Sequence, residues 1–104
     1  MYQYNKYKAK VKRVVDGDTV DLEIDLGFHV VIRERGRLLN VDTPERGHHD
    51  WARATETFGN LLSKEADGGG YVNVTCSGKG KYGRWLIDIE NVNSVLAEEW
   101  PYER

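Results

Sequence analysis

Apolar and polar residues alternate along two segments near the start of the chain, residues 7–15 and 18–25. The apolar positions are Tyr7, Ala9 and Val11 in the first segment and Val20, Leu22 and Ile24 in the second. A period of two is typical of a strand with one buried face. Asp16-Gly17 lies between the segments and is a strong hairpin-turn signal. The pattern therefore predicts an antiparallel hairpin.

Lysines make up most of the polar face of the first segment, and this face has two interpretations. Lysines interleaved with tyrosines can form a stacking surface for single-stranded nucleic acid. Lysines on a first strand also commonly protect an exposed sheet edge. We favour edge protection, because it is the commoner reason for lysines at such positions.

Hydrophobic periodicity and turn residues place five further elements along the chain. They are a strand at residues 28–39, a helix that begins near Trp51 and ends before the glycines at 68–70, strands at 71–77 and 84–89, and a short helix at 94–99. Gly36 interrupts the third strand, which is typical of a bulge. Arg37 shares the face of Leu39 and Val41, and we expect it to be partly enclosed rather than on the surface. This order predicts an all-β or α+β fold, a five-stranded Greek-key barrel of the OB type with two packed helices. Periodicity alone also allows another small α+β roll.

Length, charge and cysteine content narrow the class of protein. We expect a single domain over residues 1–104, because this length is typical of one domain. Cys76 is the only cysteine, which excludes an internal disulfide, and we expect it to be buried in a strand. The net charge of -2 argues mildly against a passive nucleic-acid binder, which is usually basic. A metal-dependent enzyme can be acidic, since its carboxylates hold cations.

Charged residues gather at a sharp corner between residues 37 and 45. Pro44 removes an amide donor and disfavours a helical conformation at Thr43, so the strand is expected to end there. Arg37, Asp42 and Glu45 lie within these nine residues. Gathering charges of both signs at a sharp corner costs free energy, so protein stability alone is a poor explanation for them. Asp-Thr-Pro-Glu is also a good helix start. Taken by itself, the stretch favours the helix start.

Oxygen ligands and arginines at the ends of these strands suit phosphate chemistry. Asp18 opens one strand and Asp42 closes another, so both carboxylates can converge if the strands are neighbours. Such hard ligands suit calcium, with the Thr43 carbonyl as a further donor. Glu45 is placed to orient or deprotonate a water molecule. Arg84, with Arg37, can hold phosphate oxygens bidentately.

Each of these residues also has an ordinary explanation. Asp16 and Asp18 suit a turn, and Arg84 can pair with an acidic residue on a neighbouring strand. We interpret His48 and His49 as loop residues rather than metal ligands, because adjacent side chains are expected to point apart. Only the joint occurrence of the motifs favours a site.

Three fragments, taken together and in order, resemble the staphylococcal nuclease (thermonuclease) family. They are Val15-Asp-Gly-Asp-Thr-Val20, Arg37-Leu-Leu-Asn-Val-Asp-Thr-Pro-Glu45 and Lys81-Tyr-Gly-Arg84. The resemblance runs from about Val11 to Leu96. It implies an OB-type barrel and calcium-dependent cleavage of DNA and RNA to 3′-phosphate products, and we expect single-stranded or frayed substrate to be preferred.

The matching motif positions imply a role for each residue of the site. The resemblance implies calcium ligands at Asp18, Asp42 and the Thr43 carbonyl, an outer acidic residue at Asp16, a general base at Glu45, phosphate-binding arginines at Arg37 and Arg84, and contacts to a terminal phosphate from Lys81 and Tyr82. Beyond Leu96 the chain departs from the family, whose members commonly carry a longer second helix and a third helix.

The competing interpretation is a catalytically inactive module of the same fold that binds nucleic acid or protein. Such a module is expected to lack one or more of the charged motif residues, and all are present. The first eight residues have no apolar signal region, and eighteen apolar residues never run together. We therefore expect no membrane association. The missing signal region also departs from secreted members of the family, so the resemblance implies a cytoplasmic or phage-encoded intracellular protein, with a mature secreted form also compatible. We expect a monomer.

Overall fold

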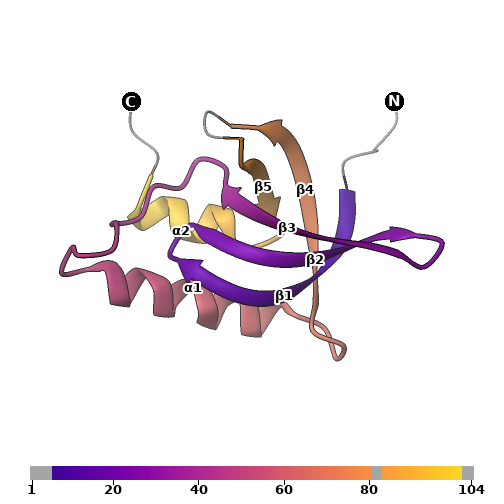
Figure 1. Cartoon of the computed structure of the whole chain (residues 1–104). Helices are drawn as coiled ribbons and strands as arrows, with labels where there is room; N and C mark the ends of the chain where they lie inside the picture. Colours follow the sequence, from indigo (N-terminus) through magenta and orange to yellow (C-terminus); the bar gives the residue numbers. More distant parts are fainter. Residues whose placement is uncertain (1–5, 81–82, 102–104) are drawn as a thin grey trace.

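The computed structural model describes residues 6–80 and 83–101, and these form a closed five-stranded barrel with two helices (Figure 1). The elements in chain order are β1 (Lys6–Asp16), β2 (Thr19–Gly27), β3 (Val30–Leu38), α1 (Trp51–Glu65), β4 (Tyr71–Lys79), β5 (Trp85–Ile89) and α2 (Asn93–Glu99). The predicted OB-like α+β architecture is confirmed. None of the described helices is long and apolar enough to cross a membrane.

The strands close in the order β1-β2-β3-β5-β4, with β4 returning to pair with β1. Antiparallel pairing joins all neighbours except β3 and β5, which run parallel. Because β1 has a partner on each side over residues 8–10, the interpretation of the lysines in that stretch as protection of a sheet edge is wrong. The lysines lie instead on the outer surface of a continuous sheet.

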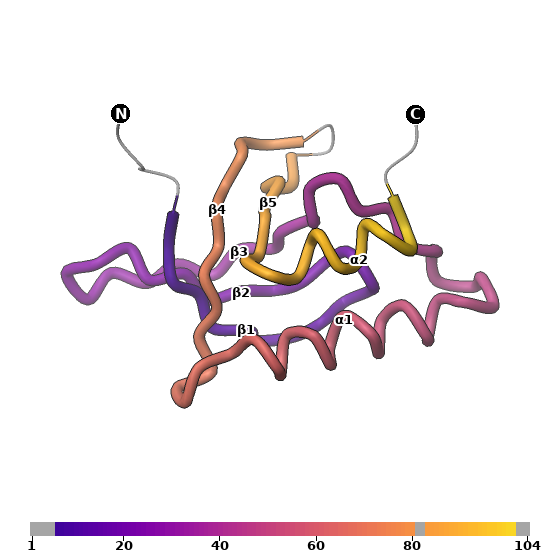
Figure 2. The backbone as a smooth tube through the Cα atoms, turned by 180° about the vertical axis from the view of Figure 1, so that it is seen from behind, coloured from indigo at the N-terminus to yellow at the C-terminus, as the bar shows by residue number. Residues whose placement is uncertain are grey.

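The core lies inside the barrel and under the two helices. The predicted alternation is confirmed in β2, where Val20 and Leu22 are buried. Helix α1 buries Ala54, Phe58 and Leu62 on one face, and Figure 2 shows it running beneath the barrel beside β1. The apolar residues recur at helical spacing, so a helix gathers them on one face, and this face packs against the barrel.

Several element boundaries differ from those expected. The third strand begins at Val30 because Phe28 and His29 form a turn with positive φ angles of 53° and 63°. Arg84 lies just before β5 rather than in it. Cys76 lies in β4 as expected, but it is only half-buried.

Helix α1 starts at Trp51, several residues after the Asp-Thr-Pro-Glu corner. The corner is therefore not a helix start, and the ordinary explanation for its composition does not hold. Asn40 has a positive φ of 66° and ends the alternation of β3. Val41, one residue further on, is therefore buried, whereas the regular alternation before Asn40 leaves Leu39 only half-buried beside buried Leu38.

Candidate active-site cleft

Strand pairing brings three distant segments of the chain to one end of the barrel. Thr19 pairs with Arg37 between β2 and β3, and the Leu38 amide donates to the Asp18 carbonyl at 2.8 Å. The parallel pairing of β3 with β5 sets Trp85 opposite Gly36. Arg84, one residue before Trp85, is thereby held beside the end of β3.

Arg37 links the carboxylates to the corner. Its Nη2 lies 3.3 Å from Asp18 Oδ2 and 3.2 Å from Asp42 Oδ1. Its Nη1 donates to the carbonyls of Leu38 at 3.3 Å and Val41 at 3.1 Å. The Arg37 side chain is 19% exposed, which agrees with the expected enclosed position. The corner itself encloses it, since Arg37 lies on the opposite parity to the buried Leu38.

Asp18 is held in one orientation by its neighbours. Its Oδ2 accepts the Thr43 amide at 3.1 Å, and its Oδ1 accepts the Thr19 hydroxyl at 3.1 Å. Charge and amide donors both stabilise an ionised carboxylate. The β1–β2 turn and the corner are therefore joined through this one buried side chain.

Gly17 allows the corner to approach the β1–β2 turn. A Cβ at this position would lie 2.7 Å from Thr43 Oγ1 and 2.9 Å from the Ala54 Cβ. Both are closer than real Cβ contacts. The glycine is therefore required by the packing of three segments rather than by its own backbone angle.

Asp16 adds a third carboxylate with unusual surroundings. Burial, and secondarily the negative charge of Asp18, raises the pKa of Asp16 above its ordinary value, while Arg46, Arg84 and Arg35 lower it to a smaller extent. Among the described residues, its buried Oδ1 has no hydrogen-bond partner. The Thr43 hydroxyl is also buried without one.

These residues line a cleft of about 1230 Å³. This volume exceeds the roughly 300–1,000 Å³ of most small-molecule sites. The lining includes Asp16, Asp18, Arg37, Asp42, Thr43, Glu45 and Arg84, which are seven of the nine residues singled out in the sequence. Glu45 and Asp42 are exposed. Lys81 and Tyr82 lie outside the described residues.

The oxygen atoms of the cleft fit a hard divalent cation. Asp18 Oδ2 and Asp42 Oδ1 both contact the same Arg37 nitrogen. The distance between these two oxygens therefore cannot exceed the sum of the two contact distances. Two buried oxygens without partners, on Asp16 and Thr43, belong to the same cleft. Calcium accepts six to eight oxygen ligands, including carboxylates, carbonyls and waters. The oxygens of the cleft are therefore of the chemical type that calcium accepts.

Two residues at or near the cleft, Arg46 and His48, were not predicted from the sequence to belong to the site. Arg46 stacks over Trp51 at 4.6 Å and lowers the pKa of Asp16, and its place beside Glu45 was a usable signal. His48 lines the cleft, and its ring centroid lies 4.4 Å from that of His49. The expectation that these two side chains point apart is wrong. With Asp50 they form a cluster whose ligand atoms lie within 4.8 Å of one another.

Comparison with known proteins gives one informative similarity. No family model matches the chain. The chain is 27% identical over 114 residues to a protein of Shigella flexneri named Micrococcal nuclease. The alignment covers 92% of this chain and 59% of the relative, so the chain spans less than two thirds of the relative's length. With the five-stranded barrel, this similarity gives weak support to a domain of the staphylococcal nuclease type.

Proposed function

We propose that this chain is a calcium-dependent nuclease that hydrolyses phosphodiester bonds in DNA and RNA. The name of the Shigella relative suggests a nuclease-type function. The observation that carries the proposal is the composition of one cleft. Three carboxylates, an exposed glutamate and two arginines line the same open surface.

The carboxylates are proposed to hold the metal ion. Asp18 and Asp42, with the carbonyl of Thr43, would be its ligands, and Asp16 would accept hydrogen bonds from its water molecules. Calcium, when bound, would supply positive charge to a phosphate oxygen and favour ionisation of a nearby water. The buried oxygens of Asp16 and Thr43 without partners support this assignment.

The arginines are proposed to bind the phosphate that reacts. A guanidinium forms two parallel hydrogen bonds to phosphate oxygens, which a lysine ammonium does not. Arg37 contacts Asp42 through an exposed carboxylate, so a phosphate can compete for this contact more easily than for the one with buried Asp18. Arg84 lines the same cleft, and its positive charge lowers the pKa of Asp16. Both would stabilise negative charge on the phosphoryl oxygens in the transition state.

Glu45 is proposed to orient and deprotonate the attacking water. Its side chain is exposed at the cleft, three residues beyond Asp42. Its carbonyl accepts the His48 amide at 3.0 Å, which fixes the local backbone. Water would attack phosphorus and the 5′ oxygen would leave, which gives a 3′-phosphate product.

A catalytically inactive binding module is the second candidate. The observation in its favour is the shared contact of Arg37 with Asp18 and Asp42, because these groups already neutralise one another in part. An inactive module would bind nucleic acid in the cleft without cutting it. Cleavage assays separate the two functions.

The test of the proposal is cleavage of single-stranded DNA with calcium, with a chelator, and by two variants. Glu45→Gln is expected to reduce turnover by roughly 10²- to 10⁴-fold, the usual contribution of a general base. Glu56→Gln removes an exposed glutamate on α1 and should cleave like the wild type. Unchanged turnover in Glu45→Gln would reject the role of Glu45.

Calcium titration by calorimetry gives a readout that does not depend on cleavage. Glu45→Gln should bind calcium nearly normally, whereas Asp42→Ala should bind it more weakly. Normal calcium binding by Asp42→Ala would contradict the ligand set. If the folded wild type cuts nothing, the binding module becomes the better explanation.

A further inference from the structure

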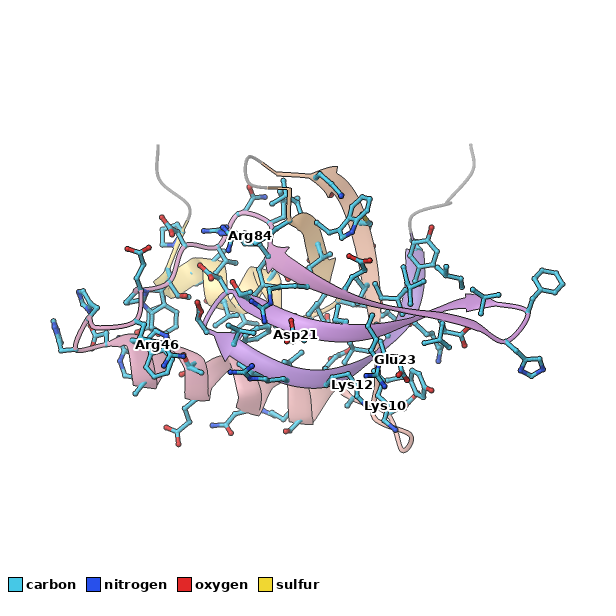
Figure 3. All side chains as sticks on the ribbon, in the orientation of Figure 1. Lys10, Lys12, Asp21, Glu23, Arg46 and Arg84 are labelled. Carbon is cyan, nitrogen blue, oxygen red and sulfur yellow. The ribbon has the colours of Figure 1, made fainter. Side chains whose placement is uncertain are left out.

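A second charged surface lies outside the cleft, on the outer face of β1, β2 and β3. The acidic residues of β2 alternate there with cations from both neighbouring strands. The register places Asp21 between Arg13 and Arg35, and Glu23 between Lys10 and Arg33. Figure 3 shows Lys10 and Lys12 beside Glu23 on this face. The three strands enclose a shallow groove of about 320 Å³.

Cations outnumber carboxylates on this surface, which we call the basic face. Its cations are Lys10, Lys12, Arg13, Arg33 and Arg35, and its acids are Asp21, Glu23 and Glu34. A register shift between Val11 and Arg13 leaves Lys12 and Arg13 both exposed. The whole chain carries a net charge of -2, so the excess of two positive charges here opposes the overall balance. A local positive surface on an acidic protein favours an anionic ligand.

The acidic residues hold the arginines in place without enclosing them. Asp21 accepts hydrogen bonds from Arg35 Nε at 2.7 Å and from Nη2 at 3.2 Å. Arg35 Nη1 takes part in neither contact, and the side chain is 49% exposed. Arg33 contacts Glu23 at 3.4 Å and is 76% exposed. An arginine fixed along one edge keeps further N–H groups for a phosphate.

The basic face leads directly into the cleft. Arg33, Arg35 and Arg37 have the same parity on β3 and follow one another at intervals of about 7 Å. Arg37 lines the cleft, and Arg35 lies two positions before it on the same strand, with its side chain held by Asp21 of β2. A row of arginines therefore runs from the groove to the proposed site of cleavage. Its spacing is similar to that of successive phosphates in an extended single strand.

We propose that the basic face binds the phosphate backbone of single-stranded nucleic acid where the strand leaves the cleft. It is an extended binding site rather than part of the reaction, and only its link to cleavage rests on the proposed function. Contacts of this kind are independent of sequence and sensitive to salt. The strand occupies the face only when it is too long for the cleft alone.

The test compares labelled oligothymidylates of 20 and 4 nucleotides, bound in chelator to prevent cutting and followed by fluorescence anisotropy. Lys12→Gln/Arg33→Gln removes two exposed cations of the basic face. Its affinity for the 20-mer should fall about tenfold. The slope of log K against the logarithm of salt concentration should become less steep by about 1.4, since each of the two lost single-strand contacts contributes about 0.7. Affinity for the 4-mer should not change.

The matched control, Lys6→Gln/Lys64→Gln, removes the same charge from exposed positions outside the groove. It should bind both oligomers like the wild type. Equal losses in the two double variants, or an equal loss for both oligomers, would overturn the proposal. A 20-residue polyglutamate is the second probe. If the wild type binds it as tightly as the 20-mer, and Lys12→Gln/Arg33→Gln weakens both to the same extent, the ligand is an acidic protein segment instead.

Calcium-dependent cleavage separates this proposal from the proposed function. If the wild type binds the 20-mer through the basic face but cuts neither oligomer, the extended site remains and the nuclease assignment fails. If it cuts the 4-mer and the double variant binds and cuts the 20-mer normally, the nuclease assignment remains and the extended site is rejected. With both proposals correct, the double variant cuts the 4-mer normally and shows a raised KM for the 20-mer.

Discussion

The β2–β3 pair has two very different ends. At the cleft end, Arg37 is largely enclosed and contacts two carboxylates and two carbonyls. At the other end, the hairpin extends beyond the barrel (Figure 1), and Phe28 at its tip is 97% exposed. The same two strands thus run from a charged, enclosed site to an exposed apolar turn. The segments that pack against each end of the pair, rather than the two strands themselves, therefore determine whether the side chains at that end are enclosed.

The glycines at the two ends show the same contrast. Gly36 packs against Ile87, whose Cδ1 would lie 2.6 Å from an added Cβ. Gly27 has nothing within 4 Å of an added Cβ, and its φ of 85° is the reason for a glycine there. One glycine is required by tertiary packing and the other by its own turn.

The largest expected effect comes from Arg37. Arg37→Ala should lower the free energy of unfolding by about 3 kcal/mol, because it leaves the buried carboxylate of Asp18 without its cation. Arg33→Ala removes an exposed arginine of the same parity on the same strand and should cost below about 1 kcal/mol. Urea unfolding measures both. Similar losses in the two variants would show that the cleft end is no more tightly held than the rest of β3.

A smaller effect is expected from the glycines. Gly17→Ala should destabilise the protein by about 2 kcal/mol, because its Cβ would overlap Thr43 and Ala54. Gly27→Ala meets no atom and should cost about 1 kcal/mol for its left-handed backbone. Only Gly17→Ala should also weaken cleavage, since Thr43 would move away from Asp18. Normal cleavage by Gly17→Ala would show that the corner can move without harm.

The smallest expected effect, and a favourable one, is at the hairpin tip. Phe28 and His29 both have positive φ angles, which Asn-Gly adopts more readily in a two-residue hairpin. Phe28→Asn/His29→Gly should raise the free energy of unfolding by about 0.5–1 kcal/mol. Thermal unfolding checks the change, and cleavage should stay the same. A loss of stability would indicate that exposed Phe28 has a favourable contact.

Most of the fold could be predicted from local patterns in the sequence. The alternation in β2, the helical stripe of α1 and the glycines after it each report on residues close in sequence. The tip of the hairpin was misplaced because Phe-His carries none of the usual turn residues. The lysines of β1 were misinterpreted because barrel closure, which gives β1 a second partner, leaves no local pattern.

The candidate site was only partly accessible to the same reasoning. Asp42, Thr43 and Glu45 stand together at a proline corner, so their grouping is visible in the chain. Arg46 was missed although it stands beside Glu45, and only the fold reveals its relation to Asp16. The enclosure of Arg37 was expected, but it arises from Asp18 and the corner rather than from the parity of Leu39 and Val41.

The sequence by itself determined the strands, the helices and the charged residues available at their ends, because periodicity and turn chemistry act over a few residues. Only the tertiary structure decided which of those charges meet. Asp18 and Thr43 are separated by 25 positions and become hydrogen-bonded neighbours through the register of β2 with β3. The arginines of β3 and the cations of β1 flank the same acidic residues of β2 for the same reason, since strand pairing joins residues that no local pattern relates.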